Sequence, residues 1–215
     1  MAKRLLIVGS GGAGKEAAQI ARRIDPRRAV WESISYVAAS AAEIGQPRPY
    51  GTIDYSDADV LAGAVTADVV IGLNDPESRR RIASRYIELP GLSFPNLIDP
   101  SVEIDRDLVT LGKGNVFHRG VVLTCDIVIG DFNLLNKACI VAHDVHLGSF
   151  NTVQPAASLH GHVHVGNGCM LGSGARVLPN VSLADRTAIG AGAVLLRTVS
   201  EPGHVYVGVP AKRLR

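Results

Sequence analysis

Residues 141–165 read VAHDVHLGSFNTVQPAASLHGHVHV, and every sixth residue of this stretch is a branched aliphatic side chain. The five positions are Val141, Leu147, Val153, Leu159 and Val165. A repeat of six residues is typical of a parallel β-helix, in which three hexads form one coil of three short strands. The stretch therefore predicts a prism whose axis is filled by the periodic side chains.

The same period runs well beyond these residues in both directions. Fifteen positions, each six residues after the one before, are occupied only by leucine, isoleucine, valine or phenylalanine: Leu111, Phe117, Leu123, Ile129, Leu135, Val141, Leu147, Val153, Leu159, Val165, Leu171, Val177, Leu183, Ile189 and Leu195. From Leu111 to about Ser200 this gives five uninterrupted coils, stacked through strand hydrogen bonds at a spacing of about 4.8 Å. Val102 and Leu108 are out of phase, so we expect an irregular first coil. The spacing alone does not fix the handedness.

Two further regularities accompany the periodic residue. The residue two positions before it is often small, and glycine often follows it directly, at Gly112, Gly130, Gly148, Gly166, Gly172 and Gly190. Glycine adopts backbone conformations that other residues avoid. We therefore predict sharp corners at these six glycines.

The first ninety residues alternate strand and helix patterns instead. The apolar runs predict strands, and the helical spacings predict two helices, the second opened by the cap Asn74-Asp75-Pro76. The expected strands are 5–8, 34–37 and 67–73, and the expected helices are 15–24 and 76–87. Such alternation favours a small parallel sheet with crossover helices. We predict a Rossmann-like half domain over residues 1–90 and a β-helix domain over residues 91–215.

A glycine-rich loop joins the first expected strand to the first helix. Residues 9–14 read GSGGAG, which satisfies the GxGxxG pattern in the context where its backbone N–H groups can bind a phosphate. An NAD site would also need an acidic residue near the end of the second strand. Ala38 and Ala39 stand there, and Glu32 and Glu43 are expected to be poorly placed. The alternative is a tight turn that binds nothing.

His143 and Asp144 stand just after a periodic residue, where side chains leave the core. A carboxylate beside an imidazole stabilises the protonated ring, which suits a general base. Gly161, eighteen residues later, is expected one strand spacing above His143, where it offers a bare backbone N–H. A base and an N–H donor together suit attack on a carbonyl group. The alternative is an ordinary surface histidine.

The other histidines raise the alternative of a metal site. His160, His162 and His164 alternate, and His164 lies one coil above His146. Carbonic-anhydrase-like β-helix proteins hold zinc with three histidines, two of them five residues apart, and no two histidines here have that spacing. We therefore expect no metal cofactor.

Composition narrows the functional classes. The chain has 215 residues, of which 47% are hydrophobic and 20% charged, with a net charge of +2, so nucleic-acid binding and membrane insertion are not expected. Three cysteines without a CxxC pair fit a reducing compartment. No apolar run is long enough for a signal peptide or a membrane span. We expect a cytoplasmic protein.

The two halves together resemble a known family, the bacterial sugar acyltransferases that include sialic acid O-acetyltransferases and UDP-4-amino-sugar N-acetyltransferases. The resemblance covers nearly the whole chain and rests on six segments: IVGSGGAGK, DVVIGLND, PNLIDPSV, IVAHD, LGSGARVLPNVSLADRTAIGAGAVLLRTV and the ending GVPAKRLR. It implies a left-handed β-helix and a homotrimer with active sites between subunits. It also implies acetyl-CoA as co-substrate and a nucleotide-sugar bound by the N-terminal domain.

The resemblance also assigns roles to individual residues. His143 corresponds to the general base, Asp144 to its acidic partner, and Gly161 to the donor for the thioester oxygen. The remaining implied contacts are with the coenzyme, at Thr152, Ser173, Ala191, Lys212 and Arg213, and with the nucleotide-sugar, at Gly11, Gly12, Ala13 and Gly72.

The sequence and the resemblance together predict an acetyl-CoA-dependent acetyltransferase that acts on the amino group of a nucleotide-linked 4-amino-sugar. Transfer to a hydroxyl group of a sugar acid, or to another small acceptor, is the first alternative. A non-catalytic nucleotide-binding scaffold is the second.

Overall fold

The computed structural model describes residues 3–63 and 65–214, and it divides into two compact units, Met1–Asp99 and Pro100–Arg215. The sequence prediction placed this boundary after residue 90. The difference arises because β6 (Leu92–Ser93) still pairs with β5 (Ala67–Ile71) in the sheet of the first unit. Among the described residues, no helix is both long and apolar enough to cross a membrane.

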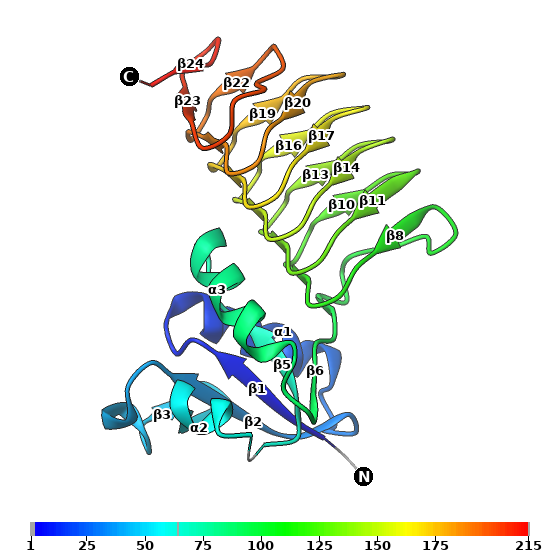
Figure 1. Ribbon diagram of the computed structural model, residues 1–215. Helices are drawn as coiled ribbons and strands as arrows, with labels where there is room; N and C mark the ends of the chain where they lie inside the picture. The colour runs from blue at the N-terminus through cyan, green and yellow to red at the C-terminus, as the bar shows by residue number, and fades with distance from the viewer. Residues whose placement is uncertain (1–2, 64, 215) are drawn as a thin grey trace. The chain divides into compact units, whose positions relative to one another are not determined.

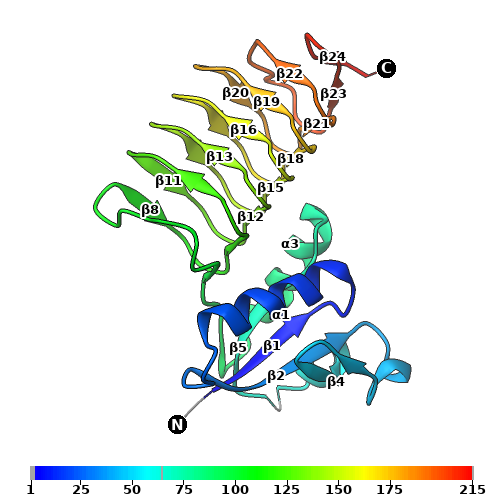
Figure 2. The ribbon, with the colours of Figure 1, turned by 180° about the vertical axis from the view of Figure 1, so that it is seen from behind.

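The first unit is an α/β unit around one sheet with the strand order β3-β4-β2-β1-β5-β6 (Figure 1). All neighbouring pairs are parallel except β3 with β4. The remaining elements are β1 (Lys3–Val8), β2 (Trp31–Ala38), β3 (Pro47–Arg48), β4 (Gly51–Ser56), α1 (Gly12–Ile24), the 3-10 turn η1 (Ala41–Glu43), α2 (Asp57–Leu61) and α3 (Pro76–Tyr86). The three strands and two helices expected from the sequence are all present, and Figure 2 shows α1 crossing the sheet.

Local sequence explains where the two long helices begin. The Asp75 carboxylate accepts a hydrogen bond from the Ser78 N–H at 2.8 Å, and Pro76 is the first helical residue of α3. Helix α1 begins after Gly11, which offers no side-chain cap, and it buries Ala17, Ile20 and Ala21 against the sheet. No side chain therefore caps the N-terminus of α1, whereas Asp75 caps that of α3.

The second unit is a parallel β-helix with three sheets, one for each face of the coil. One sheet contains β10 (Val122–Leu123), β13 (Ile140–Val141), β16 (Ser158–Leu159), β19 (Arg176–Val177) and β22 (Val194–Leu195). The second contains β8 (Val109–Leu111), β11 (Ile127–Ile129), β14 (His146–Leu147), β17 (His164–Val165) and β20 (Ser182–Leu183). The third runs through β9 (Val116–Phe117), β12 (Leu134–Leu135), β15 (Thr152–Val153), β18 (Met170–Leu171), β21 (Ala188–Ile189), β23 (Val205–Val207) and β24 (Lys212–Arg213). Strand β7 (Leu97–Ile98) is the last strand of the first unit.

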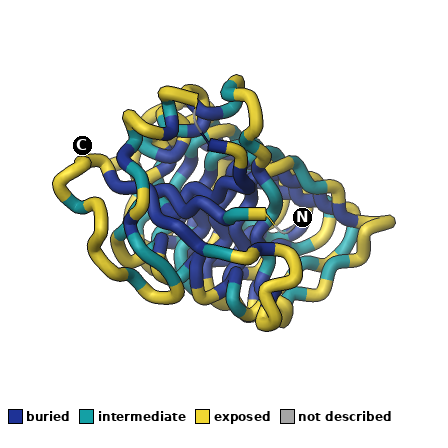
Figure 3. Tube along the Cα trace, turned by 90° about the horizontal axis from the view of Figure 1, so that it is seen from below, coloured by how far each residue is buried: buried dark blue, intermediate teal, exposed yellow. Residues whose placement is uncertain are grey.

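The pairing register confirms the eighteen-residue coil. Val141 pairs with Leu159, and Leu159 with Val177, each partner eighteen residues further along. Of the fifteen periodic side chains, thirteen are buried. Leu111 and Leu123, which lie in the first coil, are only partly buried. Figure 3 shows buried residues along the inner parts of the trace and exposed residues in its outer turns.

The corners of the β-helix lie two residues later than the sequence predicted. Every sixth residue from Gly114 to Gly192 has a left-handed backbone, with φ between 53° and 74°. They are Gly114, Gly120, Asp126, Phe132, Ala138, Asp144, Phe150, Ala156, His162, Gly168, Gly174, Asn180, Arg186 and Gly192. Each stands three residues after a periodic side chain, whereas the glycines of the prediction stand one residue after it.

The six glycines that were predicted at corners are required for a different physical reason. None of Gly112, Gly130, Gly148, Gly166, Gly172 and Gly190 has a positive φ. A Cβ atom on Gly148 would lie 2.7 Å from the carbonyl oxygen of Gly166 in the next coil. Glycine is required there because successive coils approach closely, so the prediction of sharp corners at these six residues is wrong.

Residues after β22 cover the last strand of each sheet. In the third sheet β23 pairs with β21, and β24 then pairs antiparallel with β23. The Val199 N–H donates to the Ser182 carbonyl beside β20, and the Ala211 N–H donates to the Val194 carbonyl of β22. The final segment thus continues the hydrogen bonding of all three faces.

Candidate active site

The turn that follows β13 carries His143 and Asp144 and is stacked between equivalent turns of the neighbouring coils. The Asp144 N–H donates to the Cys125 carbonyl at 3.1 Å, and the His162 N–H donates to the His143 carbonyl at 3.0 Å. These backbone bonds fix the turn in the stack. His143 and Asp144 are half exposed, with side-chain exposures of 53% and 42%.

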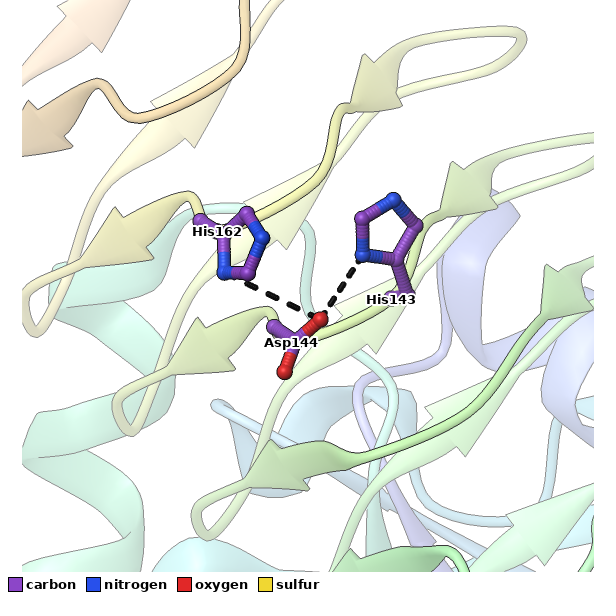
Figure 4. Close-up of side chains that lie close together, drawn as sticks. All are labelled: His143, Asp144 and His162. Carbon is purple, nitrogen blue, oxygen red and sulfur yellow. Dashed lines mark hydrogen bonds and ion pairs between the residues drawn. The ribbon is translucent and has the colours of Figure 1, made fainter.

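The His143 imidazole and the Asp144 carboxylate are in direct contact. Nδ1 of His143 lies 2.7 Å from Oδ2 of Asp144 (Figure 4). Successive side chains of a strand point to opposite faces. Here the left-handed backbone of Asp144, with φ of 58°, turns the chain so that the two adjacent side chains meet. When Nδ1–H donates to the carboxylate, Nε2 of the neutral ring is a free acceptor.

The hydrogen bond from His143 lowers the pKa of Asp144 below its ordinary value. The charges of the neighbouring His162 and His146 act in the same direction. Asp144 is therefore an anion throughout the neutral pH range and can hold the imidazole by a charge-assisted hydrogen bond.

Gly161 lies against the His143 ring, as the register predicts. A Cβ atom on Gly161 would be 2.5 Å from Cε1 and 2.7 Å from Nε2 of His143. The imidazole therefore occupies the space that a side chain at Gly161 would need. Among the described residues, the Gly161 N–H has no hydrogen-bond partner.

A neighbouring corner shows why this N–H has no partner. There the Ser149 N–H donates to Oδ1 of Asn167, eighteen residues later, at 2.8 Å, and the Asn167 N–H donates to Asp185 in the same way. The residue eighteen positions after Gly161 is Pro179, whose side chain has no acceptor. A donor therefore remains available at Gly161, the residue against which the His143 ring packs.

His162 joins the pair from the coil above and was not singled out by the sequence analysis as its neighbour. Nδ1 of His162 lies 3.7 Å from Oδ2 of Asp144, and the two imidazoles meet edge to face with ring centroids 5.2 Å apart. The sequence spacing could have predicted this contact, because His162 follows Asp144 by eighteen residues, which is one coil. One ligand atom from each of His143, Asp144 and His162 lies within 4.8 Å of the others, so these residues could hold a metal ion.

The first unit contains a separate cavity of about 410 Å³ beside the glycine loop. It lies at the carboxyl ends of β1 and β2 and is lined by residues that include Gly9, Ser10, Gly11, Ala38, Ala39, Glu43, Arg81 and Arg85. The position of Glu43 contradicts the sequence prediction, because η1 turns the chain back toward the loop. Its Oε2 atom accepts a hydrogen bond from the Ser10 hydroxyl at 3.3 Å. Arg81 and Arg85 stand four residues apart on α3, and no sequence motif predicts them as part of the site.

Sequence and structure comparisons place the chain among known proteins. Residues 162–197 match the family model for bacterial transferase hexapeptide repeats, with six repeats. The chain is similar over 99% of its length to a variant of perosamine N-acetyltransferase from Caulobacter crescentus in complex with CoA and GDP-perosamine. The identity is 27%, the match covers 97% of that chain, and the TM-score is 0.87.

The acetyltransferase domain of PglB from Neisseria gonorrhoeae is similar as well. It is 25% identical, the match covers 99% of this chain and all of that domain, and the TM-score is 0.89. The predicted resemblance to bacterial sugar acyltransferases is confirmed, and the chain is an acyltransferase. The predicted fold class, an α/β unit followed by a left-handed parallel β-helix, is thereby confirmed. No curated protein matches the sequence.

In this acyltransferase the expected coenzyme residues do not form one cluster. Ser173 and Ala191 are exposed and stack in one turn, where the Gly192 N–H donates to the Ser173 carbonyl at 2.8 Å. That turn precedes β19 and β22, whereas the turn of His143 and Gly161 follows the strands of the same face. Thr152 is fully buried on β15.

The basic residues near the end of the acyltransferase lie on β24, and both are exposed. Nη1 of Arg213 lies 2.8 Å from Oε2 of Glu201, so that guanidinium already has a carboxylate partner. Lys212 makes no ion pair among the described residues. A phosphate contact at either residue stays a prediction.

The four expected nucleotide-sugar residues differ in accessibility. Gly11 and Gly12 are exposed, and a Cβ atom on either would meet nothing within 4 Å. Ala13 is partly exposed. Gly72 is buried, and a Cβ atom there would lie 2.7 Å from the Cα atom of Gly14. The structure gives Gly72 a packing role against α1, and its contact with a substrate stays a prediction.

We expect Gly161→Ala to raise the pKa of Asp144 toward its ordinary value. The new methyl group would displace the His143 ring and break the hydrogen bond that holds the carboxylate pKa down. A ¹³C NMR titration of the Asp144 carboxyl group measures the shift. The backbone should tolerate alanine, because Gly161 has no positive φ.

Pro179→Ala, at the same corner one coil further along, is the matched control and should leave the Asp144 titration unchanged. If Gly161→Ala also leaves it unchanged while the thermal midpoint is preserved, the contact between Gly161 and His143 does not control this pair.

Proposed function

We propose that the protein transfers an acetyl group from acetyl-CoA to the amino group of a nucleotide-linked 4-amino-sugar, with His143 as general base. The observation that carries the proposal is the His143–Asp144 pair, whose imidazole packs against Gly161, a residue whose N–H has no partner among the described residues. The N-acetyltransferase similar to this chain binds CoA and GDP-perosamine. Among the similar structures are variants of that enzyme in which one histidine is replaced by asparagine or by alanine.

In the proposed reaction the acceptor nitrogen attacks the thioester carbonyl carbon while Nε2 of His143 removes a proton from the amine. The carbonyl oxygen becomes an oxyanion and accepts a hydrogen bond from the Gly161 N–H. The C–S bond then breaks, the amide forms, and CoA leaves as a thiol after taking up a proton. Asp144 stabilises the imidazolium and keeps the ring in the reactive tautomer. No acyl-enzyme intermediate is required.

The remaining predicted residues are assigned to the binding of the two substrates. We assign the β-helix residues Ser173, Ala191, Thr152, Lys212 and Arg213 to the coenzyme, and the N-terminal unit to the nucleotide-sugar, with Gly11, Gly12, Ala13 and Gly72 near it. The cavity that contains Gly11 supports the second assignment, because backbone N–H groups and the Arg81 guanidinium are suited to phosphate, whereas Arg85 already pairs with Asp57 at 2.8 Å. The three cysteines are free thiols, which favours the cytoplasm as the compartment.

The experiment that tests the function is a thiol-release assay with acetyl-CoA and a panel of nucleotide-linked amino-sugars, chosen after a thermal-shift screen. We expect release that depends on an acceptor with a free 4-amino group, and mass spectrometry should show the N-acetyl product. The same sugar with a 4-hydroxyl group is the matched control. Transfer to hydroxyl groups only would replace the proposed reaction by O-acetylation. Binding of nucleotide-sugars without any transfer would indicate a scaffold.

His143→Ala should lower kcat by about 10²–10⁴, the usual contribution of a positioned general base. The KM for acetyl-CoA should change little, because the proposed role of His143 is proton transfer. His146→Ala is the control, since this exposed side chain stacks on His164 and lies outside the pair. Near-full turnover of His143→Ala with a verified acceptor would mean that the histidine is a surface feature.

We also propose a homotrimer with active sites shared between subunits. Apolar side chains stand exposed on both faces that meet at the His143 corner: Val122 (49%) and Ile140 (46%) on one, and Val128 (41%) on the other. Large exposed aliphatic side chains close to a site are typical of a surface that another subunit covers. Light scattering at micromolar concentration should give about three times the chain mass, and a fully active monomer would contradict shared sites.

A further inference from the structure

The acidic and imidazole groups around His143 form a compact set of three metal-ligand atoms. Nδ1 of His143 and Nδ1 of His162 approach the same oxygen of Asp144, at 2.7 Å and 3.7 Å. Figure 4 shows the two rings on either side of the carboxylate. The ligand atoms come from two successive coils, whose turns are joined by the hydrogen bond between the His162 N–H and the His143 carbonyl.

The three groups approach the ligand spacing that zinc requires. Zinc is bound at about 2.0–2.2 Å by imidazole nitrogen and carboxylate oxygen, which in a tetrahedral site places ligand atoms about 3.3–3.5 Å apart. The two nitrogen–oxygen distances here are 2.7 Å and 3.7 Å, and one ligand atom from each residue lies within 4.8 Å of the others. Rotations of half-exposed side chains would bring them to that spacing, while the backbone stays in place.

We propose that His143, Asp144 and His162 bind a zinc ion, and that the bound ion inhibits acyl transfer. The fourth position of the zinc is open in the single chain, where all three side chains are between 42% and 54% exposed. Two imidazoles and one carboxylate favour zinc over magnesium, which prefers oxygen ligands and octahedral geometry.

The inhibition follows from the tautomer of His143 and rests on its proposed role as base. A neutral imidazole that binds zinc through Nδ1 carries its proton on Nε2. Nε2 then has no lone pair with which to accept the proton of the acceptor amine. Zinc also takes the Asp144 oxygen that would stabilise the imidazolium. The metal is an inhibitor in this proposal, and turnover needs none.

The binding test uses the purified full-length protein alone, without substrates, titrated with Zn²⁺ in competition with a chromophoric chelator. We expect one ion per chain and at least about a tenfold loss of affinity in His162→Asn, since changes at less direct metal contacts already cost that much. Asparagine suits the left-handed backbone, and Asn180 occupies the equivalent position in the next coil. Mg²⁺ should not compete.

Two control variants separate this site from other zinc ligands. His164→Ser removes a neighbouring exposed histidine, with serine already present at the equivalent Ser182. Cys125→Ser removes the partly exposed thiol. Both should keep the wild-type affinity for zinc. Equal zinc affinity in the wild type and His162→Asn, or loss of binding in either control, would overturn the site.

The inhibition test follows the acetylated product by mass spectrometry, because the released CoA thiol itself binds zinc. Zn²⁺ should inhibit the wild-type enzyme at the concentration where the site fills, and EDTA should restore the full rate. In His162→Asn, measured against that variant's own zinc-free rate, the zinc concentration for half inhibition should rise by at least about tenfold. Binding at the site without inhibition would overturn the inhibitory role. Failure of His143 as the base appears separately, as turnover retained in His143→Ala.

Discussion

The left-handed turn at every sixth residue is the constraint on which the C-terminal unit depends. It allows each short strand to end and the next to begin on the adjacent face, while the backbone stays in register with the coil eighteen residues away. A residue other than glycine loses roughly 1–2 kcal/mol in this conformation. At Phe132 the loss is offset, because the ring is buried and stacks on Phe150 with centroids 5.4 Å apart. Burial of such a side chain contributes about 1.5–3 kcal/mol.

The same constraint builds the candidate active site. The turn at Asp144 brings two adjacent side chains into contact, and the register places Gly161 and His162 above them. Three relations therefore follow from position in the stack: the His143–Asp144 hydrogen bond, the packing of Gly161 on the ring, and the approach of His162. The reactive geometry needs no loop of its own, since each group is fixed by the hydrogen bonds that join the coils.

Much of this architecture could be predicted from the sequence, because a period of six residues has few structural solutions. The periodic column, the eighteen-residue register and the position of Gly161 above His143 follow from counting. The positions of the corners cannot be predicted from the glycines. Gly148 is glycine because successive coils approach closely there, whereas Phe132 and Arg186 adopt the left-handed turn although they are not glycine. The position of Glu43 could not be predicted from the sequence pattern either. Its approach to the glycine loop depends on the 3-10 turn Ala41–Glu43, which no periodic pattern signals.

The segment that covers the last coil has a consequence for how the molecule behaves in solution. A β-helix exposes a row of unpaired backbone groups wherever its stack stops, and such an edge can recruit another chain. Here Val199, Ala211 and β23 occupy the edges of the three faces, and β24 adds an antiparallel strand that carries Lys212 and Arg213. Antiparallel direction and positive charge both oppose the addition of a further parallel coil. The C-terminal residues thus act as a terminator that keeps one repeat array from growing into a fibre.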